Sequence, residues 1–221
     1  MTGRALVLGA SGGIGAALAA ALEQRGDTVT RLSRSQDGFD LADPDSVAAG
    51  LGRLDGPFDS LLIASGILAP PDSRPEKSLA EIEARSMAQV LAVNAIGPAL
   101  VLRHAPRLLP RRGRSVVGVL TARVGSIGDN RLGGWYSYRA AKAAANQIVH
   151  TAAIELARTH AEAVVVALHP GTVETAFTQD YPAHKKVAAA QAAANLLDVL
   201  DGLGPEQSGQ FFDWAGQVVP W

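Results

Sequence analysis

Two tyrosines and a lysine stand close together in the segment WYSYRAAK, residues 135–142, and these side chains can carry out proton transfer. On a helix, positions i and i+4 share one face, so Tyr138 and Lys142 can reach one ligand together, whereas Tyr136 has Ala140 at that offset. A nearby ammonium group stabilises tyrosinate and lowers the phenol pKa, which is ordinarily about 10. The spacing therefore selects Tyr138 as general acid/base with Lys142 as its partner. The alternative is a packing aromatic beside a surface lysine.

A glycine-rich turn near the N-terminus could hold a nucleotide. The sequence ALVLGASGGIGAALAAALEQRG places the turn between an expected strand and an expected helix. Glycines allow a tight turn and a close approach to a pyrophosphate, and the helix N-terminus offers free N–H groups to the phosphates. A dinucleotide site is therefore expected here rather than a plain tight turn, formed by Gly9, Ser11, Gly12, Gly13, Ile14 and Gly15.

The elements that must position these residues follow from an alternation of short β-branched runs with Ala-rich stretches. Several runs are apolar at consecutive positions, as in strands covered on both faces. Strands are expected at 5–9, 27–33, 58–65, 114–122, 163–169 and 210–214, and helices at 13–25, 43–53, 76–108, 137–159 and 184–201. The alternation predicts an α/β fold: a Rossmann-type doubly wound parallel β-sheet flanked by helices, in a single domain over residues 1–221.

The composition narrows the function classes. The chain has 221 residues, a net charge of −1 and no cysteine, so disulfides and thiolate metal sites are excluded. Without a long basic run, no nucleic-acid partner and no membrane-surface partner are expected. The N-terminus lacks a signal-peptide pattern, and no uninterrupted apolar stretch reaches roughly 18–20 residues, so a cytoplasmic protein is expected. No His, Asp and Glu set has metal-ligand spacing, so no metal site is expected.

Several further motifs follow the glycine turn in order along the chain. They are Asp40-Leu41, ASG with Ser65 and Gly66, VNAIG around Asn94, YxxxK at 138–142 and HPGTVET at 169–175. Together with GxxxGxG at 9–15 they resemble the short-chain dehydrogenase/reductase family over essentially the whole chain. The segments ARVGSIGDNRLGGWYSYRAAK and GQFFDWAGQVVPW resemble its C-factor-like and sniffer-like carbonyl reductase branch. ASG departs from the family's usual Asn-Ala-Gly.

The resemblance implies roles that spacing alone does not assign. Asp40 and Leu41 would contact the adenine ring, and Ser65 and Gly66 would also lie against the cofactor. Lys142 would hydrogen-bond the nicotinamide ribose, and Asn94 would hold a water in a proton relay. The alternative for Asn94 is a residue that only kinks its helix. The nicotinamide carboxamide would bind at the turn formed by Pro170, Gly171, Val173 and Thr175.

The serine that polarises the substrate carbonyl in this family has no direct counterpart. The family's Ser-Ser pair ends the strand before the catalytic helix, but here that strand ends in Thr121 and Ala122, and Ala122 has no hydroxyl. Ser126 lies twelve residues before Tyr138 and could replace the missing donor if the loop folds back. Otherwise Thr121 or a water would serve, and Ser126 would form an ordinary loop hydrogen bond.

The end of the second expected strand bears on the choice of nicotinamide cofactor. An acidic residue there would bind the ribose 2′-OH of NAD, but the chain reads LSRS, with Ser33 followed by Arg34. An arginine can pair with a 2′-phosphate through two hydrogen bonds. NADP(H) is therefore favoured over NAD(H). The alternative is that Arg34 is only a solvated loop arginine.

The substrate side of the sequence is less specific. The segment FTQDYPAHKKV, residues 177–187, is brief, and with Phe177 and Tyr181 it favours a short lid over a partly apolar pocket with Trp135 near its rim. Ala-rich helices can pack closely against copies of themselves, so a homodimer or homotetramer is expected.

These observations predict an NADPH-dependent oxidoreductase that reduces a small-molecule carbonyl compound, an aldehyde or ketone, to the alcohol by hydride transfer. The alternative is a nucleotide-binding C-factor-like signalling or regulatory protein with little or no turnover.

Overall fold

Short runs of buried aliphatic residues form the strands, and in a computed structural model, which describes residues 3–178 and 186–221, six of them lie parallel in one sheet. The spatial order is β2-β1-β3-β4-β5-β8. Their bounds are β1 Arg4–Leu8, β2 Thr28–Leu32, β3 Ser60–Ile63, β4 Ser115–Leu120, β5 Ala163–His169 and β8 Phe211–Asp213. The predicted fold class, a Rossmann-type doubly wound parallel sheet, is confirmed.

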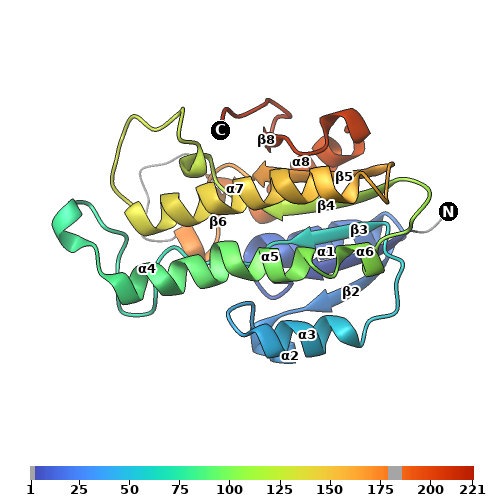
Figure 1. The fold of residues 1–221 in the computed structure, drawn as a ribbon, viewed down its shortest axis with the longest axis horizontal. Coiled ribbons are helices and arrows are strands. Elements are labelled where there is room, and N and C mark those ends of the chain that lie inside the picture. Colours follow the sequence, from blue (N-terminus) through green and yellow to red (C-terminus); the bar gives the residue numbers. More distant parts are fainter. Residues whose placement is uncertain (1–2, 179–185) are drawn as a thin grey trace.

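Helices cover both faces of this sheet (Figure 1). One face packs against α1 (Gly13–Gln24) and α8 (Ala189–Asp201). The other packs against α3 (Pro44–Gly52), α5 (Gly97–Leu102) and α7 (Tyr136–Leu156), and α4 (Ala84–Leu91) continues this layer beyond the strand ends. Two short helices, α2 (Arg34–Asp37) and α6 (Ala105–Leu108), and a small parallel pair, β6 (Val173–Glu174) and β7 (Val187–Ala188), complete the elements used below.

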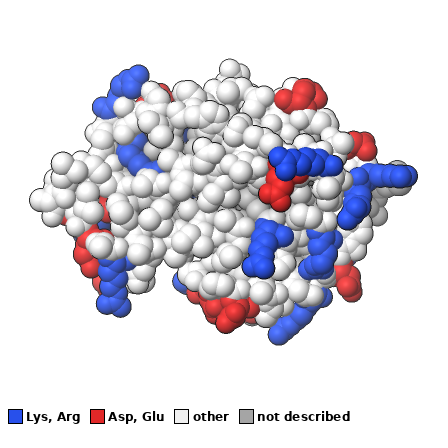
Figure 2. Space-filling model, in the orientation of Figure 1, with Lys and Arg blue, Asp and Glu red and all other residues white. Residues whose placement is uncertain are grey.

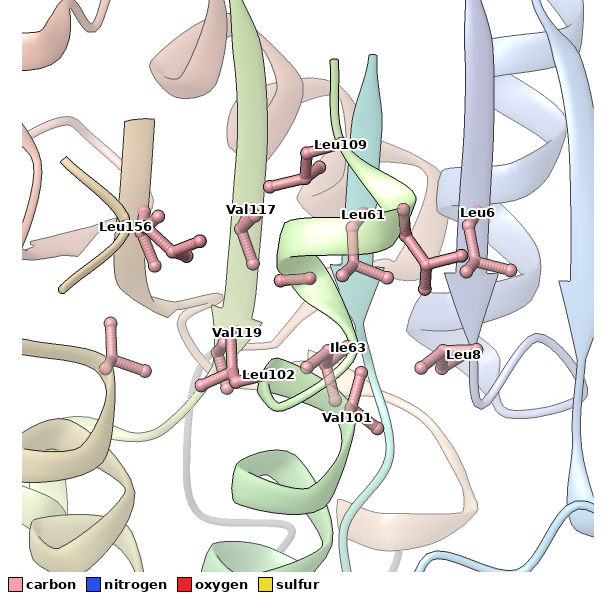
Figure 3. Close-up of a cluster of buried hydrophobic side chains, with 14 of the residues drawn as sticks. Leu6, Leu8, Leu61, Ile63, Val101, Leu102, Leu109, Val117, Val119 and Leu156 are labelled. Atoms are coloured by element: carbon pink, nitrogen blue, oxygen red, sulfur yellow. The ribbon is translucent and has the colours of Figure 1, made fainter. Parts of the chain in front are cut away.

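The two-sided cover explains why the strands are apolar at consecutive positions. In β4, Val117 and Val119 face the α5 and α7 layer, where they meet Leu102 and Leu156 (Figure 3). The alternate residues Val116 and Leu120 belong to the core on the α1 and α8 side. Successive side chains of a strand point to opposite faces, so each face of β4 needs its own apolar set.

The stretch expected as one helix over 76–108 is several elements. A 3₁₀ turn at Leu79–Glu81 precedes α4, and a π-helical turn at Ala92–Ile96 separates α4 from α5. The Asn94 amide donates to the Val90 carbonyl (2.9 Å) and to the Ile67 carbonyl (2.8 Å), which holds the widened turn in place. The residues Ala84–Leu102 are long and apolar enough to cross a membrane by length and composition alone, but here they pack against α7.

Other expected bounds shift by a few residues. The strands end earlier than predicted except β5, which agrees, and α7 begins at Tyr136 and ends at Leu156 rather than spanning 137–159. The last helix, expected from 184, begins at Ala189, and residues 184 and 185 lie outside the described part of the chain. On the face shown in Figure 2, many of the charged side chains lie in the right-hand half, others lie along the left and lower margins, and the centre is mostly uncharged.

The chain reverses its winding direction between β1 and β3, which are neighbours in the sheet although β2 lies between them in sequence. In doubly wound sheets the ligand crevice opens at the carboxyl ends of the strands at such a point. The glycine turn after β1 lies there and packs tightly. A Cβ added at Gly9 would lie 2.6 Å from the Ser65 Oγ, and one added at Gly15 would lie 2.2 Å from the Gly9 carbonyl oxygen.

We therefore expect Gly15→Ala to lower the free energy of unfolding by about 1–3 kcal/mol, because its methyl group would press on main-chain atoms that cannot move aside. The matched control is Gly12→Ala, whose Cβ would lie 3.4 Å from the same Gly9 oxygen and in ordinary contact. Thermal melting of the two variants measures the difference. Equal melting temperatures would show that the turn has room for a side chain at both positions.

Candidate active site

A cavity of about 270 Å³ opens at the carboxyl ends of the strands. Its lining comes from the turn after β1, the segment Ala64–Gly66 after β3, the segment Leu120–Ala122 at the end of β4, and His169–Gly171 at the end of β5. Tyr138 and Lys142 of α7 and Phe177 lie on the same cavity. The predicted cofactor turn and the predicted proton-transfer pair therefore share one space.

The glycine turn has the shape of a main-chain cradle. Gly9 has a positive φ of 81°, and the Gly12 N–H donates to the Gly9 carbonyl at 3.0 Å. The helix α1 begins at Gly13, where a Cβ would lie 2.4 Å from the Thr175 Cγ2. Glycine at this point lets the Thr175 side chain pack directly against the start of α1. The free N–H groups of this helix N-terminus are the groups that can receive a pyrophosphate.

The residues predicted to bind the adenosine half are not part of the lining of this cavity. Ser33 caps α2, and its buried hydroxyl donates to the Asp37 carboxylate at 3.1 Å. Arg34 is exposed and forms no ion pair within residues 3–178 and 186–221. The Asp40 carboxylate accepts from the Ala42 N–H at 2.9 Å, and Leu41 is buried against Gly97.

Tyr138 and Lys142 are both buried on the inner face of α7, with exposed fractions of 6% and 3%. The Lys142 Nζ donates to the Leu120 carbonyl at 2.9 Å and lies 5.7 Å from the centre of the Tyr138 ring. The phenol ring packs between Trp135, at a centroid distance of 6.2 Å, and Phe177, at 6.0 Å. The half-buried Tyr136 is outside the cavity lining, which agrees with the helical phase.

Burial sets the protonation of this pair. It raises the pKa of Tyr138 above its ordinary value, because the charged tyrosinate is poorly solvated there. It lowers the pKa of Lys142 to about 8, because the ammonium is the charged form of that group. Near neutral pH the phenol is therefore neutral and able to donate a proton, while the lysine is still largely charged.

Asn94 lies next to this pair rather than on the cavity lining. Its Oδ1 accepts from the Ile67 N–H at 3.2 Å, and both amide hydrogens are used by the Ile67 and Val90 carbonyls. A Cβ on Gly66 would lie 2.8 Å from the Asn94 Oδ1 and 3.5 Å from the Lys142 Nζ. Gly66 therefore lets the asparagine, the lysine and the β3 end approach one another.

Ser126 is not among the residues that line the cavity. It is buried, and its Oγ accepts from the Asp129 N–H at 3.1 Å, which closes the turn after β4. Ala122 lines the cavity and packs in the cluster around Tyr138. Thr121 also belongs to the lining, and its buried hydroxyl has no hydrogen-bond partner among the described residues. Of the two predicted substitutes, only Thr121 comes to the cavity.

The turn after β5 adds the remaining predicted residues. Pro170, Gly171, Val173 and Thr175 all line the cavity, as does His169. Burial, with the Arg123 guanidinium nearby, lowers the pKa of His169 to about 4, so its imidazole is neutral. Its Nδ1 has no partner within the described part of the chain. Tyr181 lies outside the described residues.

One residue near the site was missed by the sequence analysis. Glu76 is 6% exposed and contacts the first turn of α7. A glutamate in the Pro-rich loop GILAPPDSRPE resembles an ordinary solvated loop residue, so no local pattern marks it. Among residues 3–178 and 186–221, no group of three or more His, Asp and Glu side chains is arranged to hold a metal ion.

The sequence is similar to a known protein family and to known proteins. Residues 38–200, more than half of the chain, match the family model described as enoyl-(acyl carrier protein) reductase. The chain is 31% identical to 1-hydroxy-2-glutathionyl-2-methyl-3-butene dehydrogenase of Rhodococcus sp. (strain AD45). The alignment of 232 residues covers 98% of each chain. It is 37% identical over 170 residues to C-signal of Myxococcus xanthus, covering 75% of this chain and 94% of that one.

Solved structures resemble the fold over the full length. A short-chain dehydrogenase/reductase from Burkholderia multivorans with bound NADP superposes with a TM-score of 0.82 at 25% identity, covering 100% of both chains. A carbonyl reductase from Pseudomonas aeruginosa PAO1 superposes with a TM-score of 0.79 at 26% identity, again over 100% of both chains. With the parallel sheet, the glycine cradle and the full-length relatives in agreement, the chain belongs to the short-chain dehydrogenase/reductase family of NAD(P)-dependent oxidoreductases.

Proposed function

We propose that this protein reduces a small aldehyde or ketone with NADPH, and that Tyr138 protonates the carbonyl oxygen. The observation that carries the proposal is a buried tyrosine and a buried lysine, one helical turn apart, on a cavity that also contains a main-chain cradle for a dinucleotide. The names of the full-length relatives support the class: one is a dehydrogenase and one solved neighbour is a carbonyl reductase.

The bound nicotinamide would supply the hydride, held by the cradle and by the turn that contains Val173 and Thr175. When the hydride adds to the carbonyl carbon, the C=O π electrons move to oxygen, and the Tyr138 O–H bond breaks to give its proton to that oxygen. The Lys142 ammonium stabilises the tyrosinate left behind until solvent returns the proton. The Trp135 and Phe177 rings exclude water from the phenol and hold its orientation.

Replacing Tyr138 tests the proton donor. We expect Tyr138→Phe to reduce kcat with NADPH and an active aldehyde or ketone by about 10²–10⁴-fold, because the phenyl ring keeps the packing but has no proton to give. The control is Tyr136→Phe, which removes a hydroxyl outside the cavity. NADPH binding, followed by cofactor fluorescence, stays near the wild-type level in both. A Tyr138→Phe enzyme with the wild-type rate would exclude this role.

Ala122 leaves the site without the family's substrate-polarising hydroxyl. We propose that the unpaired Thr121 hydroxyl, or a water, provides the hydrogen bond to the developing oxyanion instead, while Ser126 serves the turn. In other enzymes a preorganised oxyanion donor raises kcat by about 10²–10³-fold. A site with a weaker donor should therefore become faster when a better donor is added.

A hydroxyl restored at position 122 tests this point. We expect Ala122→Ser to raise kcat by about 3- to 10-fold, a fraction of the effect of a full oxyanion donor, because the new hydroxyl lies in the cluster around Tyr138. Steady-state kinetics of this variant beside Ser126→Ala measures the effect. If Ser126→Ala loses more activity than Thr121→Val, Ser126 rather than Thr121 provides the hydrogen bond to the oxyanion.

The preference for NADPH rests on Arg34. This guanidinium is exposed at the carboxyl end of β2, without an ion pair in the described residues, and is free to bind a 2′-phosphate. Arg31, three residues earlier on β2, is already paired with Glu23 at 2.8 Å. The Burkholderia neighbour with bound NADP is in accord with this choice.

Arg34→Ala should raise KM for NADPH by about 10-fold or more and leave KM for NADH nearly unchanged, because only the phosphorylated ribose loses a charged hydrogen bond. Arg31→Ala is the matched control and should leave the ratio of the two KM values unchanged. Initial rates with each cofactor give the comparison. An equal rise in both KM values would show that Arg34 contributes only to folding of the β2 end.

Two observations favour a second function. The relative named C-signal and the missing hydroxyl at Ala122 both fit a nucleotide-binding regulatory protein with little turnover. The substrate panel separates the two functions. NADPH consumption that depends on Tyr138 supports the reductase, whereas tight NADPH binding without consumption on any aldehyde, ketone or quinone supports the regulatory protein.

A further inference from the structure

Glu76 contacts the first turn of α7 from a loop far away in sequence. Its carbonyl oxygen accepts from the Trp135 N–H at 2.5 Å. Its carboxylate accepts from the Ser137 N–H at 3.2 Å and, through the other oxygen, from the Ser137 hydroxyl. Glu76 and Ser137 are buried, with exposed fractions of 6% and 3%. Trp135 and Ser137, the residues on either side of Tyr136, are therefore held by the backbone and the side chain of Glu76.

The helix has no capping group of its own that could do this. Its N-cap position is Trp135, which has a positive φ of 53° and no side-chain cap bond, and the first turn contains no acidic residue. The first N–H groups of a helix lack intrahelical partners, and a carboxylate beside them is stabilised by the helix dipole. Glu76 supplies the acceptors that an Asp or Ser N-cap would otherwise provide.

The held turn is the one that carries the proton donor. Ser137 directly precedes Tyr138, and the Trp135 ring packs edge-on against the Tyr138 ring. Glu76 itself is absent from the cavity lining, so it has no direct access to a substrate there. We propose that Glu76 is a positioning residue that sets the place of the Tyr138 phenol; the inference rests on the proposed function, in which Tyr138 is the proton donor.

The chemistry of the contact favours a carboxylate. Ser137 presents two donors, an N–H and an O–H, and an ionised carboxylate offers acceptors only. A glutamine could keep both contacts if the serine hydroxyl turned to accept from the amide, so Glu76→Gln preserves the geometry at reduced strength. Glu76→Ala would leave two donors unpaired in a buried place and free the first turn to shift.

Steady-state kinetics of both variants tests the inference. We expect Glu76→Ala to lower kcat by about 10- to 100-fold, because small displacements of a reacting group cost this much, with KM for NADPH within about 2-fold of wild type. Glu76→Gln should restore most of the rate. The control is Glu81→Ala: Glu81 is exposed in the 3₁₀ turn that follows the loop, where it accepts from the Lys77 N–H at 2.8 Å, and its loss should leave kcat unchanged.

A double-mutant cycle localises the effect. Ser137→Ala should lower kcat in the same direction, and the double variant should be no slower than Glu76→Ala, because the two side chains act through one contact. A folded Glu76→Ala enzyme with the wild-type kcat overturns the inference. So does a variant that loses NADPH affinity as much as kcat, since that would indicate general destabilisation.

Ultraviolet titration of the Tyr138 phenol, taken as the difference from Tyr138→Phe, separates this test from the proposed function. Glu76→Ala should bring the phenol pKa back towards its ordinary value as the ring becomes more exposed, and Glu81→Ala should not. If the wild-type protein binds NADPH but reduces no substrate, the proposed function is wrong. The titration then still tests whether Glu76 positions the Tyr138 phenol. An unchanged titration with unchanged kcat overturns the positioning role.

Discussion

The site depends on a buried ammonium group at the carboxyl end of β4. Lys142 is almost fully covered, and its Nζ is held by the Leu120 carbonyl at 2.9 Å. An unpaired buried charge is costly, so this bond fixes how α7 is rotated and how closely it approaches the sheet. The approach requires glycines on two sides: a Cβ on Gly125 would lie 2.8 Å from Lys142, and one on Gly66 would lie 3.5 Å from its Nζ. Once α7 is fixed in this way, the i−4 residue, Tyr138, faces the same cavity.

Burial supports the chemistry in one direction more than the other. It raises the pKa of the Tyr138 phenol, which keeps the phenol protonated, as the proposed carbonyl reduction requires. In the proposed mechanism the reverse reaction would need tyrosinate, and the nearby Lys142 ammonium would have to offset the cost of that buried negative charge. In the proposed reduction, Tyr138 therefore starts protonated, and the site offers no hydroxyl at Ala122 to share the developing charge.

The sequence predicted those parts of the molecule that follow from local periodicity. Strands covered on both faces are continuous in apolar residues, and helical phase alone distinguished Tyr138 from Tyr136. The break in the expected helix over 76–108 was not predictable in this way, because it depends on Asn94 bonding to Ile67, 27 residues earlier. Ser126 had the right distance along the chain, but the turn after β4 closes on Asp129 and uses its hydroxyl internally.

The loop after β3 shows why such features escape a local pattern. It touches the region around Tyr138 and Lys142 at three separate points: Gly66 beside Lys142, Ile67 on Asn94, and Glu76 on Ser137. Each contact joins the loop to a different turn of the helix layer, so the loop ties the π-helical turn between α4 and α5 to the start of α7 (Figure 1). The residues of this loop are polar and Pro-rich because their backbone lies near the surface, yet two of them anchor buried groups. The position of Tyr138 therefore depends on long-range contacts of a segment that contributes little to the cavity wall itself.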